Sequence, residues 1–71
     1  MMREFSVVIE RDEEGFYVAS VPALPGCHTQ ARSLDELIER AREAIAVHLE
    51  ERGEEAERLE FIGVQRVTVS A

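Results

Sequence analysis

VPALPGCHTQARSLDE, the stretch over residues 21–36, holds both prolines of the chain and one of its four glycines. Pro22 and Pro25 fix their own φ angles and bring the residues that precede them into extended geometry. The pair Pro25-Gly26 suits the two central positions of a type II turn, because glycine takes the positive φ angle of the second position at little cost. The stretch therefore predicts a rigid corner between two extended segments, and we assign Pro22, Pro25 and Gly26 a structural role.

A helix is predicted to begin at the end of this stretch. The hydroxyl of Ser33 is placed to accept the N–H of Glu36, and the Glu36 side chain to reach back to the N–H of Ser33, which makes a capping box. Along the following turns, apolar residues recur every three or four positions and charged residues occupy the positions between them. The pattern predicts a helix over residues 33–52 that ends near Gly53.

The pattern of the residues before the helix predicts three strands. Residues 5–10 and 16–21 have the alternation of half-buried strands, and residues 11–15 between them contain three acids and a glycine, which is typical of a hairpin loop. Residues 27–32 form a third extended run beyond the corner. Because consecutive strands with short connections are usually neighbours, we expect a three-stranded antiparallel meander.

A final strand is predicted after the helix, over residues 61–69. Its alternation changes parity halfway, which indicates a β-bulge near residues 63–66 or a strand that pairs over only part of its length. The apolar residues on either side of the change are Ile62, Val64, Val67 and Val69. The order β-β-β-α-β predicts an α+β fold, with one helix on one face of an antiparallel sheet, in a single domain over residues 1–71.

The size of the chain favours self-association. A 71-residue chain has a small core, and small domains often gain stability by assembling. On the sheet face opposite the helix we expect Val8, Tyr17 and Ala19, which are apolar enough to be covered by a second subunit. We therefore predict a homodimer or a larger even-numbered assembly, held through strand edges or through that face.

The composition limits the class of protein. Fifteen acids against eight bases give a net charge of −7, which argues against direct nucleic-acid binding and favours a basic partner or simple solubility. The sequence has neither an apolar run long enough to span a membrane nor a signal peptide, and its single cysteine suits a reducing compartment. A cytoplasmic protein is expected.

The residue types that could carry chemistry are poorly arranged for it. Cys27 and His28 are adjacent, so on a strand their side chains point to opposite faces, and His48 is too distant in the sequence to complete a familiar metal-ligand spacing. The acids lie on a loop and along a helix rather than at converging strand positions. We predict no enzyme, no cofactor and no metal site; a small hydrolase that uses Cys27 or the acids is the weakest alternative.

The motif V-P-x-L-P-G-C at residues 21–27 resembles that of the HicB-like antitoxin family. In that family an acidic hairpin comes before the motif, and a T-x-G-[DE]-[ST]-x-x-E helix start follows it. The resemblance covers residues 5–49, and the final strand fits as well. It implies a partially degraded RNase H-like fold without catalytic carboxylates, and a function of binding and neutralising a small basic HicA-type toxin, an mRNA interferase.

Two departures from the family pattern stand out. Ala31 and Arg32 occupy the places where the family has glycine and an acid, so a basic side chain stands beside the loop. Many HicB antitoxins also carry a C-terminal DNA-binding domain. The residues after Gly53 are too few to supply one, so we expect operator binding to be absent from this chain.

The partner-binding surface is predicted from charge. The acids fall into two groups that would flank a basic partner, while an apolar or aromatic side chain such as Tyr17 or Leu24 would lie nearer the centre of the contact. The first group is on the hairpin loop and the second on the outer helix face: Asp12, Glu13 and Glu14; Asp35, Glu39 and Glu43. The alternative function is a stand-alone acidic oligomer, structural or regulatory, that has no toxin partner.

Overall fold

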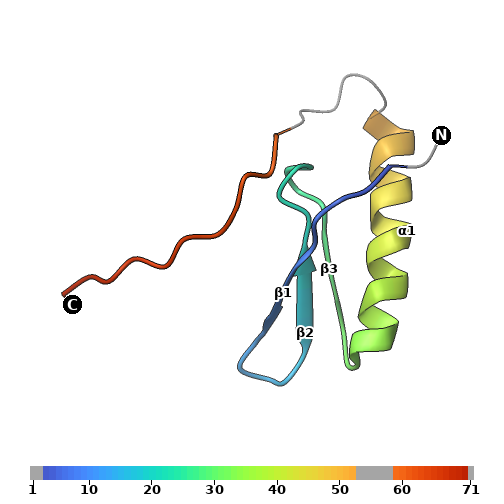
Figure 1. Ribbon diagram of the computed structural model, residues 1–71. Coiled ribbons are helices and arrows are strands. Elements are labelled where there is room, and N and C mark those ends of the chain that lie inside the picture. The colour runs from blue at the N-terminus through green and yellow to red at the C-terminus, as the bar shows by residue number, and fades with distance from the viewer. Residues whose placement is uncertain (1–2, 53–58, 71) are drawn as a thin grey trace.

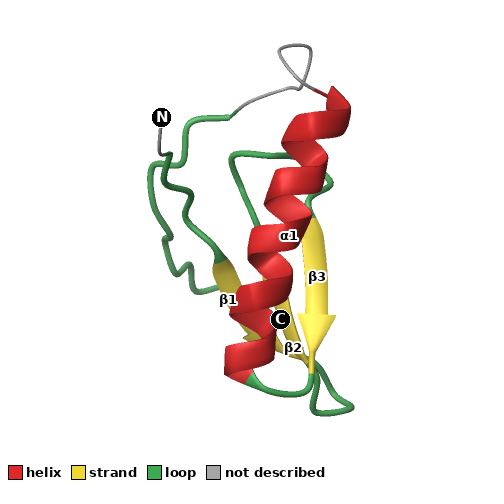
Figure 2. Cartoon of the chain, turned by 90° about the vertical axis from the view of Figure 1, so that its right-hand side faces the viewer, coloured by secondary structure: helices red, strands yellow, loops and turns green. Residues whose placement is uncertain are grey.

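A three-stranded antiparallel sheet with one helix across it makes up the fold (Figures 1 and 2). The structure, a computed structural model, describes residues 3–52 and 59–70. The elements are β1 (Val8–Arg11), β2 (Tyr17–Ser20), β3 (His28–Ala31) and α1 (Leu34–Arg52). The sheet order β1-β2-β3 confirms the predicted meander, and the α+β class is confirmed with it.

The centre of the sheet is buried because small residues let the helix approach closely. Ile9, Ala19 and Thr29 are paired across the three strands and share one face. Ala19 and Ala31 pack on this face against Leu37 and Ala41 of α1, and all four side chains are at most 3% exposed. In the first half of the helix, Leu37 and Ala41 are thus covered by alanines of β2 and β3.

The second half of the helix packs on the corner rather than on the sheet. Val21, Leu24 and Cys27 form a second buried cluster, and Leu24 is completely inaccessible to solvent. Three residues of the second half of α1 close over it: Ala44, Ile45 and Leu49. The corner therefore extends the core beyond the end of the strands.

The corner contains two successive turns inside a closed loop. The N–H of Leu24 donates to the carbonyl of Val21 at 2.9 Å, and the N–H of Cys27 donates to the carbonyl of Leu24 at 3.0 Å. Gly26 has a φ of 85°, which confirms the predicted type II turn. A bond of 3.0 Å from the N–H of Val21 to the carbonyl of Cys27 closes the loop, so the N–H and the carbonyl of Val21, Leu24 and Cys27 are all paired within it.

The sheet face that was expected to lie away from the helix is different. Tyr17 and Ala19 lie on the helix side, where Ala19 is buried in the core and Tyr17 packs against it. Only Val8 of the three expected residues lies on the opposite face, in register with Ser20 of β2. The predicted alternation along β2 is correct, but the face predicted to lie away from the helix is the one that packs against it.

The predicted final strand is wrong for the isolated chain. Residues 59–70 run away from the sheet without strand structure, although Leu59 donates its N–H to the carbonyl of Ala23 at 3.0 Å (Figure 1). The isoleucine and three valines of this segment are 76–85% exposed. A strand needs a neighbour to complete its hydrogen bonds, and the pattern of apolar residues does not supply that neighbour. The RNase H-like relationship implied by the family resemblance stays a prediction.

The first strand is shorter than its pattern. It begins at Val8, and residues 5–7 precede the sheet. If the pairing continued by one residue, residue 7 would lie opposite Val21, but the N–H of Val21 already donates to a carbonyl inside the corner. The end of α1 agrees with the prediction, whereas Gly53 lies outside the described residues. Within the described ranges, no helix is both long and apolar enough to cross a membrane.

Candidate partner-binding surface

The acidic hairpin loop is held in one shape by Asp12. Its Oδ1 accepts the N–H of Glu14 and the N–H of Phe16, each at 2.9 Å. The backbone adds bonds from the N–H of Gly15 to the carbonyl of Asp12 and from the N–H of Asp12 to the carbonyl of Phe16. Gly15 has a φ of 91°, a backbone conformation that glycine adopts at little cost. The loop thus uses one of its three acids for structure and leaves the side chains of Glu13 and Glu14 exposed.

Arg32, a departure from the family pattern, lies against this loop. Its guanidinium stacks on the ring of Phe16 at 5.2 Å from the ring centre, and Glu14 lines the same small cavity. Extending the register from Tyr17↔Ala31 by one residue places Phe16 opposite Arg32, which explains the contact. Sequence reasoning missed this pair, although a register for the meander would have revealed it.

The start of α1 is fixed by a half-formed capping box. The N–H of Glu36 donates to the Ser33 hydroxyl at 3.2 Å, as predicted. The carboxylate of Glu36 pairs with Arg40 at 2.9 Å rather than with the backbone of Ser33. Arg40 also donates to the carbonyl of Gln30 at 2.8 Å, which ties the helix to β3. The side chain of Glu36 therefore forms an ion pair instead of capping the backbone, and the cap at the helix start is supplied by Ser33.

Two groups of acids lie at one end of the molecule. The hairpin loop and the start of α1 are both at the lower end in Figure 1, so Glu13 and Glu14 share that end with the exposed acids of the first helical turns, Asp35 and Glu39. Glu43 continues the exposed face one turn further along the helix. An approaching basic surface would meet negative charge from both layers of the fold.

The two proposed central residues differ in access. Tyr17 is half-buried and stacks with Arg11, whose guanidinium is 5.4 Å from the centre of the ring. Leu24 is fully buried in the corner, so its side chain supports the fold in this conformation. Tyr17 begins β2 immediately after the acidic hairpin loop, whereas burial separates Leu24 from the surface.

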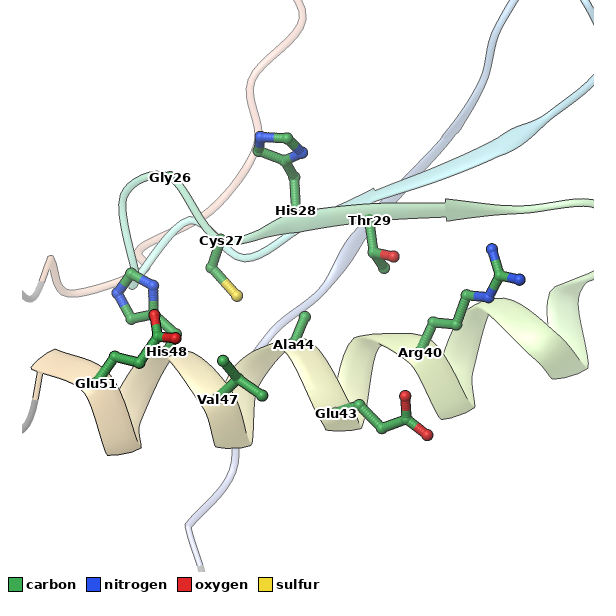
Figure 3. Close-up of a pocket in the computed structure, with 10 residues that line it drawn as sticks. All are labelled: Gly26, Cys27, His28, Thr29, Arg40, Glu43, Ala44, Val47, His48 and Glu51. Carbon is green, nitrogen blue, oxygen red and sulfur yellow. The ribbon is translucent and has the colours of Figure 1, made fainter.

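A second depression lies between the corner and the last turns of the helix (Figure 3). Its lining includes a thiol, two imidazoles and two carboxylates, contributed by Cys27, His28, His48, Glu43 and Glu51. Figure 3 shows the sulphur of Cys27 pointing toward α1 and His28 pointing away from it, as the strand alternation predicted.

The thiol of this depression is poorly suited to nucleophilic chemistry. Burial raises the pKa of the Cys27 thiol above its ordinary value, which favours the protonated form, whereas the thiolate is the reactive one. Across the described ranges, no three His, Cys, Asp or Glu side chains gather into a metal-binding group. The arrangement favours Cys27 as a small core residue.

Comparison with known proteins identifies the family. Residues 5–67 match the family model described as HicB_like antitoxin of bacterial toxin-antitoxin system. A UPF0150 protein of Archaeoglobus fulgidus is 61% identical over 93% of this chain and 94% of its own length. UPF0150 proteins of Synechocystis (48% identical over 94% of this chain and 96% of the relative) and of Thermoplasma acidophilum (37% over 96% and 99%) are similar over nearly their whole lengths. The chain therefore belongs to the HicB-like antitoxin family.

Proposed function

We propose that this chain is the antitoxin of a toxin–antitoxin pair, and that it neutralises a small basic HicA-type mRNA interferase by protein–protein contact in the cytoplasm. Family membership is the observation that carries the proposal. The net charge of −7 supports it, because an acidic surface complements the basic surface of an RNA-binding toxin. The proposal requires no catalytic group, cofactor or nucleic acid bound by the antitoxin itself.

The proposed contact is the acidic end of the molecule. Glu13 and Glu14 project from a loop whose shape is fixed by Asp12, so their carboxylates are presented with little ordering cost. Glu39 and Glu43 present charge from the helix beside them. These exposed charges are expected to raise the rate of association more than the lifetime of the complex.

Tyr17 is the proposed aromatic contact near these charges. It is half-buried, and a side chain of this kind gains most when a partner completes its burial. Leu24 acts through the fold, because a fully buried side chain offers no surface to a partner. The same proposal includes an even-numbered homo-oligomer of this chain.

Binding kinetics with a HicA-type toxin encoded beside this chain test the proposal. The double changes Glu13→Arg with Glu14→Arg, and Glu39→Arg with Glu43→Arg, should each slow association about ten-fold at low salt, with a smaller effect at high salt. The matched control is Glu50→Arg with Glu51→Arg, which alters the same charge at the far end of α1 and should leave the rate near that of the parent. Equal rates for all three variants would refute steering through the acidic end.

Tyr17 is tested separately by dissociation. Tyr17→Ala should shorten the lifetime of the complex, whereas Tyr17→Phe keeps the ring beside Arg11 and should keep most of that lifetime. A toxin that neither binds the parent chain nor is neutralised by it in growing cells would favour the alternative, a stand-alone acidic oligomer.

A further inference from the structure

The two outer edges of the sheet are protected differently. At the β3 edge, the helix lies close and Arg40 donates to the carbonyl of Gln30 at 2.8 Å. At the other edge, no side chain of the described ranges donates to β1. Residues 3–7 before it also make no backbone–backbone bond to another described residue. An open edge of this kind is a template for a further strand.

An apolar groove of about 470 Å³ lies beside this open edge. It runs between residues 3–7, which lead into β1, and one side of α1. Its apolar lining includes Phe5, Val7, Ile38, Ala41, Ile45 and Leu49. Ile38 is 37% exposed, so the apolar stripe of the helix is wider than the three strands cover. One additional strand with one apolar face would fit here, because its backbone would pair with the open edge and its apolar side chains would fill the groove.

The chain carries a segment with these properties, residues 59–70, which we call the C-terminal segment. It is extended, and its apolar side chains Ile62, Val64, Val67 and Val69 are 76–85% exposed. A β-bulge at Gln65-Arg66 would bring both pairs to one face, because a bulge adds a single residue to one strand. Residues 61–69 and residues 3–11 are equally long, so one can pair along the whole of the other.

We propose that the C-terminal segment of one copy lies along the outer edge of β1 in a second copy and fills the apolar groove there. The segment is tied at Leu59 to Ala23 and runs from that point away from its own sheet (Figure 1). A second copy can receive it without reversing that direction. A reciprocal exchange around a two-fold axis covers both grooves and both edges at once, so the assembly closes as a dimer. This proposal is independent of the toxin.

The oligomeric state of the full chain is the test. Sedimentation over micromolar to millimolar concentrations should show a dimer for the parent. Val64→Glu combined with Val67→Glu should raise the dimer dissociation constant about 100-fold or more, because the exchange would bury two carboxylates in an apolar groove. Both side chains are over 75% exposed in the single chain, so the variant should keep the far-ultraviolet circular dichroism of a folded monomer.

Val47→Glu is the control matched to Ile38→Glu, since each change adds one carboxylate at an exposed apolar residue of α1 and Val47 does not line the groove. It should leave the dissociation constant near that of the parent, and Ile38→Glu, inside the groove, should raise it. A monomeric parent at all concentrations would overturn the proposal. So would a dimer that is indifferent to the paired Val64 and Val67 changes, or amide-exchange protection of residues 61–69 in a monomer, which would show docking within one chain.

Discussion

The corner at residues 21–27 and the C-terminal segment are both rich in apolar residues, and they touch through the bond between Leu59 and Ala23. The corner is closed by three backbone bonds of its own and buries Val21, Leu24 and Cys27. The C-terminal segment makes a single backbone bond to another described residue and exposes its valines. The difference shows that prolines and a glycine specify a shape within one chain, whereas alternating β-branched residues specify a strand only where a neighbouring strand exists.

The largest expected effect comes from burial, because the side chains of the corner are buried and those of the C-terminal segment are exposed. Leu24→Ala should lower the free energy of unfolding by about 2–5 kcal/mol, because it leaves a cavity in the corner. Val67→Ala, in the C-terminal segment, should change it by less than about 0.5 kcal/mol in dilute solution. Urea unfolding followed by circular dichroism measures both. Similar losses for the two variants would show that the C-terminal segment is buried in the single chain.

Substitution of Gly26 in the corner and of Gly63 in the C-terminal segment compares the backbone strain of the two regions. Gly26 has a φ of 85° and an added Cβ would meet no atom within 4 Å, so Gly26→Val should cost about 1–3 kcal/mol through the backbone alone. Gly63 has equal space and lacks a left-handed φ, so Gly63→Val should stay within about 0.5 kcal/mol of the parent. Differential scanning calorimetry of both variants decides it. An unchanged melting temperature for Gly26→Val would remove the type II turn from the explanation.

The serine that caps the start of α1 is a second local sequence signal that can be tested. Ser33→Ala should lower the free energy of unfolding by about 1 kcal/mol, because the N–H of Glu36 loses its acceptor. Ser6→Ala is the matched control at an exposed serine outside the strands and the helix. Chemical denaturation of the pair gives the difference, and equal stabilities would mean that packing alone places the helix.

The smallest expected effect is a dependence on alkaline pH. Burial raises the pKa of the Cys27 thiol in the folded chain above its ordinary value of 9.0, so the thiol of the unfolded chain ionises first. Stability should therefore fall as the pH rises above about 9, because the folded state binds more protons there. The slope of unfolding free energy against pH should disappear in Cys27→Ala. A parent and variant with parallel slopes would contradict burial of the thiol.

Most of the fold could be predicted because its signals are local. The meander, the hairpin glycine, the type II turn and the helix that follows Ser33 each depend on residues close in the sequence. The faces of the sheet could not be matched to the helix from alternation alone, and Tyr17 was placed on the wrong side for that reason. The strand predicted over residues 61–69 was wrong because alternation of apolar residues does not show whether a neighbouring strand is present.

The candidate surface was predicted less completely. The charges of Glu13, Glu14, Glu39 and Glu43 can be read from the sequence, and the structure leaves them exposed. Their arrangement at one end follows from the way the hairpin and the helix start are brought together, which composition does not reveal. The stacking of Arg32 on Phe16 needed the strand register as well.

The double hydrogen bond accepted by Asp12 has a consequence for how such a protein diversifies. Because one carboxylate fixes the shape of the loop, the side chains at the neighbouring positions 13 and 14 are not needed for the hydrogen bonds that hold it. Mutation at those two positions can therefore change charge and size without refolding the hairpin. Duplicated copies of the gene could acquire different recognition of their partners there, while the position of Asp12 stays under constraint from folding.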